Sequence, residues 1–140
     1  MSAAVGTFEG RVEWMDTDAS GHHHNTAVVR FVESAEAALV RGAGLTGYFA
    51  SAPRVRYEVD FESRLWFGQR VVATVRVDSV GRTSLTFVFE VWGQEHGGRP
   101  RVRAARGRFV TVHVPAGSDA AQPWPQEWIA ALGLTDERKP

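Results

Sequence analysis

One long helical pattern lies in a chain whose other patterned segments, up to residue 114, alternate with a period of two. This segment, residues 26–41, has apolar side chains three or four positions apart, at Val28, Val32, Ala35 and Leu39. Polar side chains occupy the opposite side and glycines follow, which predicts an amphipathic helix that ends at the glycines. A single helix of this kind must bury its apolar stripe against a sheet built from the rest of the chain.

Strand patterns precede and follow this helix. The predicted strands span residues 7–15, 55–61, 71–80, 83–92 and 101–114. The dipeptide Gly81-Arg82 between two of them predicts a hairpin, and Gly107 inside the last one predicts a bulge. One helix with antiparallel strands predicts an α+β fold in which a sheet curls around the helix. Such a sheet leaves edges and one face uncovered, so we expect a homodimer or homotetramer.

Length and composition limit the possible classes of protein. The 140 residues suffice for a single domain, with a core over residues 7–114 and a tail over residues 115–140 that contains a short helical pattern. Sixteen basic and sixteen acidic residues cancel, which gives no reason to expect a nucleic acid or an anionic membrane as partner. The chain has no cysteine, no signal-peptide pattern and no segment of roughly 20 apolar residues, so we expect a cytoplasmic location.

The segment most informative about function joins the first predicted strand to the helix. Residues 16–25 read Asp-Thr-Asp-Ala-Ser-Gly-His-His-His-Asn. Asp16 and Asp18 therefore precede a helix N-terminus, where backbone N–H groups and the helix dipole stabilise negative charge. A carboxylate beside preorganised N–H donors is suited to hydrolysis of an activated carbonyl. Aspartates are also favoured in caps and turns, and Asp16 is expected to be mainly structural.

The pattern Asp-Thr-Asp-Ala-x-Gly-His at residues 16–22, with Asn25 and the run Val-Arg-Phe-Val-Glu at residues 29–33, resembles one known family. It is similar to the hotdog-fold acyl-CoA thioesterases of the 4-hydroxybenzoyl-CoA thioesterase type, over about residues 7–114. The resemblance implies an antiparallel five-stranded sheet wrapped around one long helix. It also implies hydrolysis of an acyl thioester to a carboxylic acid and CoA. A thioester is already activated, so we expect no cofactor other than the coenzyme A of the substrate.

The resemblance further implies roles for individual residues. Asp18 corresponds to the catalytic carboxylate, acting as nucleophile or as general base. Asn25 corresponds to the residue at the helix start whose backbone N–H polarises the thioester carbonyl, with donors expected around His24 and Asn25. Gly21 corresponds to the glycine that lets the chain turn beneath the helix. The residues that correspond to a loop contacting the CoA part of the ligand are Arg82, Thr83 and Ser84.

The three consecutive histidines, residues 22–24, depart from that family's pattern. His22 or His24 is expected to orient Asp18, bind water or protonate the leaving thiolate, and packing of the loop is the alternative. Consecutive side chains do not converge easily on one ion, so no metal site is expected. Glu36 on the helix is a reserve candidate for the base.

Three other functions stay open on the sequence alone. The acyl group is carried by CoA or, in the first alternative, by an acyl carrier protein. A hotdog dehydratase is the second alternative, although the motifs of that class are not found here. The third is a non-catalytic module that binds acyl thioesters.

Overall fold

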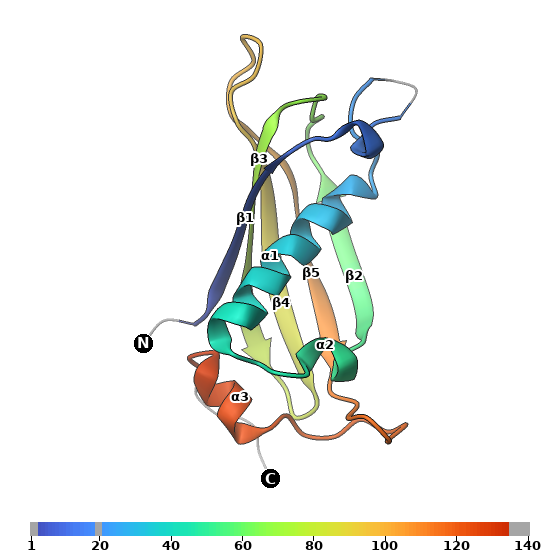
Figure 1. Cartoon of the computed structure of the whole chain (residues 1–140), viewed down its shortest axis with the longest axis vertical. Coiled ribbons are helices and arrows are strands. Elements are labelled where there is room, and N and C mark those ends of the chain that lie inside the picture. The colour runs from blue at the N-terminus through green and yellow to red at the C-terminus, as the bar shows by residue number, and fades with distance from the viewer. Residues whose placement is uncertain (1–2, 19–20, 135–140) are drawn as a thin grey trace.

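The structure is a computed structural model that describes residues 3–18 and 21–134. Within these ranges the elements are β1 (Val5–Arg11), the 3₁₀ turn η1 (Trp14–Asp16), α1 (Ala27–Ala43), α2 (Tyr48–Ser51), β2 (Arg54–Phe61), β3 (Arg70–Val80), β4 (Ser84–Gly93), β5 (Val102–Val112) and α3 (Gln126–Ala131). The long helix α1 lies across one face of the sheet (Figure 1). No helix in the described part of the chain is long and apolar enough to cross a membrane.

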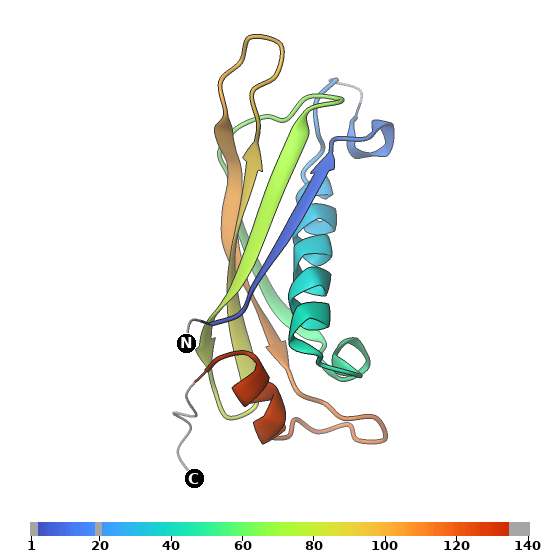
Figure 2. The ribbon, with the colours of Figure 1, turned by 60° about the vertical axis from the view of Figure 1, so that its left-hand side comes forward.

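The sheet has five strands in the order β1-β3-β4-β5-β2, and every neighbouring pair is antiparallel. It curls around α1, which covers one of its faces (Figure 2). Strand β4 alternates strictly between buried and half-buried residues. Its buried residues are Leu85, Phe87, Phe89, Val91 and Gly93. The predicted α+β hotdog fold, with one long helix and a five-stranded antiparallel sheet, is therefore confirmed.

The apolar stripe of α1 forms the centre of the core. The side chains of Phe31, Val32 and Ala35 are completely buried. Strand β1 approaches this helix closely at Gly6, where a Cβ atom would lie 2.1 Å from the carbonyl oxygen of Ala35. Only a glycine allows this contact between strand and helix without a shift of one of them.

Two local predictions about the strands are wrong. The first strand ends at Arg11 instead of residue 15, because the Asp16 carboxylate accepts the N–H of Glu13 at 2.7 Å and closes the turn η1. Gly107 is not bulged, since it pairs in regular register with both neighbouring strands. The irregularity of β5 lies instead at Ala104, between the residues that pair with Val91 and Trp92.

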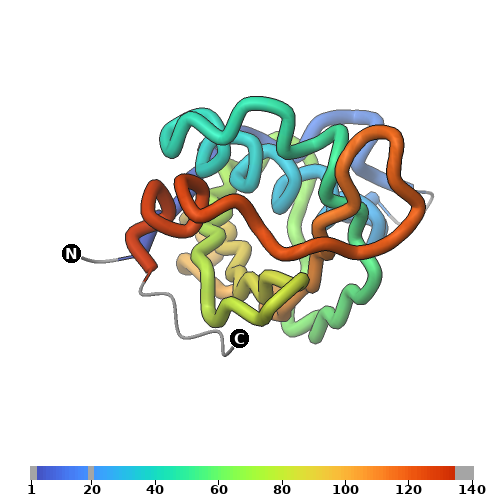
Figure 3. Tube along the Cα trace, turned by 90° about the horizontal axis from the view of Figure 1, so that it is seen from below, coloured from blue at the N-terminus to red at the C-terminus, as the bar shows by residue number. Residues whose placement is uncertain are grey.

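The C-terminal tail covers one end of the layer between the helix and the sheet (Figure 3). Trp124 stacks on Tyr48 with ring centroids 6.1 Å apart, and Ile129 and Leu132 are buried. The Leu132 carbonyl accepts the N–H of Ala4 at 2.9 Å, so the end of α3 is joined to the residue before β1. The short helix predicted in the tail is confirmed as α3, while residues 135–140 lie outside the described residues.

Candidate active site

Asp18 lies in the loop that joins η1 to α1. The two arms of the loop are joined by an isolated antiparallel bridge between Thr17 and His23. The Asp18 N–H donates to the His22 carbonyl at 3.3 Å, and the Asp18 carbonyl accepts the Gly21 N–H at 3.1 Å. Gly21 has a φ of 86°, which other residue types rarely adopt. Asp18 is exposed at the surface of this single chain.

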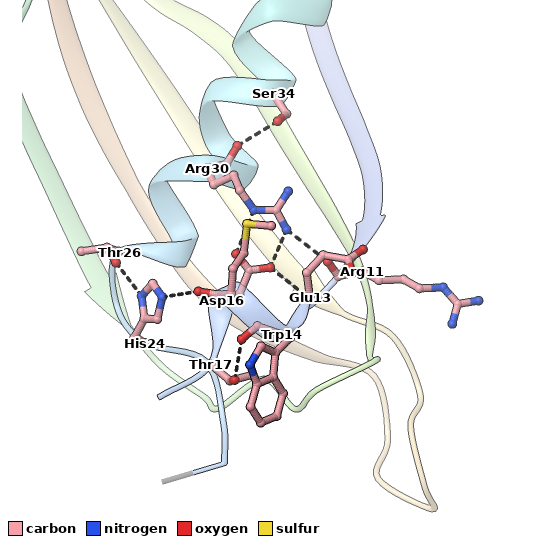
Figure 4. Close-up of polar contacts among 10 residues, drawn as sticks. Arg11, Glu13, Trp14, Asp16, Thr17, His24, Thr26, Arg30 and Ser34 are labelled. Atoms are coloured by element: carbon pink, nitrogen blue, oxygen red, sulfur yellow. Dashed lines mark hydrogen bonds and ion pairs between the residues drawn. The ribbon is translucent and has the colours of Figure 1, made fainter. Parts of the chain in front are cut away.

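Asp16 is a buried structural carboxylate (Figure 4). Arg30 on α1 donates to both of its oxygens, with the Nε bond at 2.8 Å, and the Glu13 N–H donates to one of them. Burial raises the pKa of Asp16, but these hydrogen bonds and the charge of Arg30 outweigh it and hold the pKa below its ordinary value. The predicted structural role of Asp16 is confirmed.

His24 is clamped between the turn η1 and the start of the helix (Figure 4). Its Nε2–H donates to the Met15 carbonyl at 2.9 Å, and its Nδ1 accepts the hydroxyl proton of Thr26. Both ring nitrogens therefore have protein partners, which favours the packing alternative over proton transfer to a leaving thiolate.

The neighbouring histidines point to opposite sides of the same segment. His22 is half-buried and packs edge-to-face on Trp66, with ring centroids 5.8 Å apart, next to the turn that holds Asp18. His23 is only 7% exposed, and burial together with the charge of His22 lowers its pKa. Sequence reasoning does not select His23. Its signal is the alternation of an extended segment, in which residues 22 and 24 share one side and residue 23 takes the other.

The start of α1 carries backbone donors without partners. Its N-cap, Thr26, makes no capping bond with its side chain. The amides of the first three helical residues bond to carbonyls three positions back, and the His24 N–H donates to the Asp16 carbonyl at 2.8 Å. Within the described residues, the N–H groups of Asn25 and Thr26 have no hydrogen-bond partner. Of the predicted donors at His24 and Asn25, the His24 N–H is therefore already bonded, and the Asn25 N–H has no partner among the described residues.

The hairpin residues Arg82, Thr83 and Ser84 lie at the other end of the molecule from Asp18. The hairpin between β3 and β4 is at the lower end of Figure 1, where the Thr83 carbonyl accepts the His113 N–H at 2.9 Å. The Asp18 loop is at the upper end, and the 17 residues of α1 span about 25 Å between these ends. A single chain therefore does not bring the hairpin to Asp18.

Glu36, the reserve candidate for the base, is buried in a charged pair. Arg54 donates to it at 2.5 Å and lies 3.3 Å from Glu33, and the Tyr48 hydroxyl is 3.5 Å from the Glu36 carboxylate. Burial raises the pKa of Glu36, and the adjacent Arg54 opposes that rise. Glu36 lies more than two turns beyond the helix start, so it is not part of the Asp18 loop. Among the described residues, no three His, Asp or Glu side chains are grouped to hold a metal ion.

The chain matches the model of the thioesterase-like superfamily over residues 12–132. It belongs to this superfamily, and its enzyme class is that of the thioester hydrolases. No curated protein matched the chain by sequence.

Solved structures of thioesterases share its fold. A predicted thioesterase from Bacillus stearothermophilus is 26% identical, with a TM-score of 0.80 over 93% of this chain and 95% of that one. A thioesterase from Thermus thermophilus, complexed with coenzyme A and Zn, is 23% identical, with a TM-score of 0.79 over 91% and 90%. A mutant of 4-hydroxybenzoyl CoA thioesterase complexed with 4-hydroxybenzoyl CoA is 16% identical, with a TM-score of 0.82 over 93% and 99%. The predicted family resemblance is confirmed.

Proposed function

We propose that this protein hydrolyses an acyl-CoA thioester, with Asp18 as nucleophile or general base. The observation that carries the proposal is the position of Asp18, in the loop directly before a helix start whose Asn25 and Thr26 amides have no partner among the described residues. Two of the similar structures contain coenzyme A or a CoA thioester, which supports CoA as the carrier. The reaction needs no cofactor beyond the substrate's own coenzyme A.

In the proposed reaction the thioester carbonyl oxygen accepts the Asn25 N–H, with the Thr26 N–H as a second donor. One such donor stabilises the transition state by about 3 kcal/mol, or ~10²-fold to 10³-fold in rate. As nucleophile, Asp18 bonds to the carbonyl carbon and the C–S bond breaks, so CoA leaves as the thiolate and a mixed anhydride remains for water to cleave. As general base, Asp18 instead takes a proton from the water that attacks this carbon.

We also propose that a second copy of the chain completes the site. In one chain Asp18 is exposed and the hairpin that would hold CoA is about a helix length away. Strand β2 is an edge of the sheet, and its Val55 and Phe61 are 58% and 47% exposed. Pairing of two β2 edges around a two-fold axis would place the Asp18 end of one copy beside the hairpin end of the other.

The central experiment measures release of free thiol from a panel of acyl-CoA substrates. We expect Asp18→Asn to lower kcat by at least about 10²-fold while circular dichroism shows the fold intact. Asp78→Asn, which changes an exposed carboxylate on β3, is the matched control and should keep wild-type turnover. Near-wild-type kcat in Asp18→Asn would reject the assignment. A higher kcat/KM on acyl-carrier-protein thioesters than on matched CoA thioesters would favour the alternative carrier.

The shared site is tested in the same assay by mixing two defective variants. Asp18→Asn and Arg82→Glu are each expected to be nearly inactive. Unfolding and refolding them together should restore about a quarter of wild-type activity. Half of the dimers are then mixed, and each mixed dimer has one site in which both Asp18 and Arg82 are intact. No recovery, although size exclusion shows mixed dimers, would contradict a shared site. A monomeric active enzyme would contradict it too.

A further inference from the structure

His23 presents a buried donor that no protein group in the described part of the chain satisfies. Its backbone N–H donates to the Leu65 carbonyl at 2.8 Å, and its ring Nδ1 accepts the Leu65 N–H at 3.0 Å. These two bonds fix the orientation of the ring. The Nε2 atom is enclosed by the protein and has no hydrogen-bond partner among the described residues.

The protonation of the ring follows from these contacts. Because Nδ1 accepts a hydrogen bond, the neutral imidazole carries its proton on Nε2. A buried N–H group without an acceptor is destabilising, so within the described residues the Nε2–H is an unfavourable group to bury. An unsatisfied donor with a fixed direction is therefore well suited to a hydrogen-bond acceptor supplied by a ligand.

The position of His23 indicates which part of a ligand that acceptor belongs to. His23 is two residues before Asn25, whose amide is proposed to hold the thioester oxygen, so the two residues are about 7 Å apart along the chain. His22 and His24 lie on the other side of the segment, in contact with Trp66 and with Met15 and Thr26. His23 alone of the three is turned to the interior, on the side of Leu65, which is completely buried.

We propose that the Nε2–H of His23 donates a hydrogen bond to a keto or hydroxyl oxygen close to the thioester on the acyl group. His23 would then be a specificity-determining residue that selects oxygenated acyl chains over plain hydrocarbon chains. This inference rests on the proposed thioesterase function and names the class of acyl group that the same site takes.

The test compares kcat/KM for hexanoyl-CoA, 3-hydroxyhexanoyl-CoA and 3-oxohexanoyl-CoA. Wild-type protein is expected to prefer at least one oxygenated substrate. In His23→Val the ratio of kcat/KM for the oxygenated substrate to kcat/KM for hexanoyl-CoA should fall by about 10-fold. The fall should come mainly from a lower kcat/KM for the oxygenated substrate, while turnover of hexanoyl-CoA changes little. His23→Gln keeps an N–H donor and should retain part of the preference. His96→Val, which alters a half-buried histidine in the loop between β4 and β5, is the matched control.

The other outcomes distinguish a failure of the role of His23 from a failure of the thioesterase function. Equal kcat/KM for plain and oxygenated substrates in the wild type, or an unchanged ratio in His23→Val, would overturn the role of His23 and leave the thioesterase function standing. Absence of thiol release from every acyl-CoA by the wild type would overturn both. If His23→Val fails to fold, the ratio measured with His23→Gln and with wild-type protein decides the question.

Discussion

Gly107 in the middle of β5 offers a sharp test of how tightly the sheet is assembled. A Cβ atom added there would lie 1.9 Å from the Glu58 carbonyl oxygen and 2.7 Å from Cζ of Phe89. Ordinary contacts begin at 3.4 Å, so Gly107→Ala requires β2 to move by about 1.5 Å. Overpacking of this kind costs about 1–3 kcal/mol, and each ladder hydrogen bond lost costs about 1 kcal/mol more.

With one ladder hydrogen bond lost, we therefore expect Gly107→Ala to lower the free energy of unfolding by about 2–4 kcal/mol. The measurement is urea denaturation followed by tryptophan fluorescence, at one protein concentration because association affects apparent stability. Gly42→Ala in α1 is the matched control, since nothing lies within 4 Å of its added Cβ, and it should gain about 0.5–1 kcal/mol. A Gly107→Ala protein as stable as the wild type would refute the close approach of β2 to β5.

Two further predictions concern the loop before α1. Asp16→Ala should lower the free energy of unfolding by about 2–4 kcal/mol, because Arg30 and the Glu13 N–H lose their acceptor; a urea-denaturation loss below about 1 kcal/mol would contradict this. Burial lowers the pKa of His23, so the unfolded state binds a proton more readily and stability falls as the pH drops through about 6.5. Thermal melts should therefore show a larger decrease in Tm between about pH 7.5 and 5.5 for wild type than for His23→Val, and parallel curves would contradict the buried neutral ring.

Periodicity predicted most of the fold because burial itself is periodic. The stripe of α1 and the alternation of β4 are consequences of one side of each element facing the core, and both appear in the structure. The end of β1 was mispredicted because Val12 and Trp14 continue the alternation. The Asp16 carboxylate that closes the turn there is also held by Arg30, 14 positions away, and no local pattern contains that contact.

The candidate site was predictable only in part, for a similar reason. The motif located Asp18 and the helix start, and it separated these from the structural Asp16. It did not reveal that the His24 ring is already bonded at both nitrogens, or that His23 is the member turned inward. Those facts depend on which backbone and side-chain groups lie opposite each ring. The distance between the hairpin and Asp18 could likewise be predicted only with knowledge of the register of the whole sheet.

The missing side-chain cap at Thr26 has a consequence for engineering and for evolution. Helix starts are usually easy places to gain stability, because a residue that satisfies the exposed amides is simple to introduce. In this protein the Thr26 N–H, which a glutamate in place of Val29 would satisfy in a capping box, is one of the two amides that the proposed reaction uses. Directed evolution that selects only for thermal stability would therefore favour a side chain that satisfies this amide. The gain in stability would come with a loss of catalytic turnover.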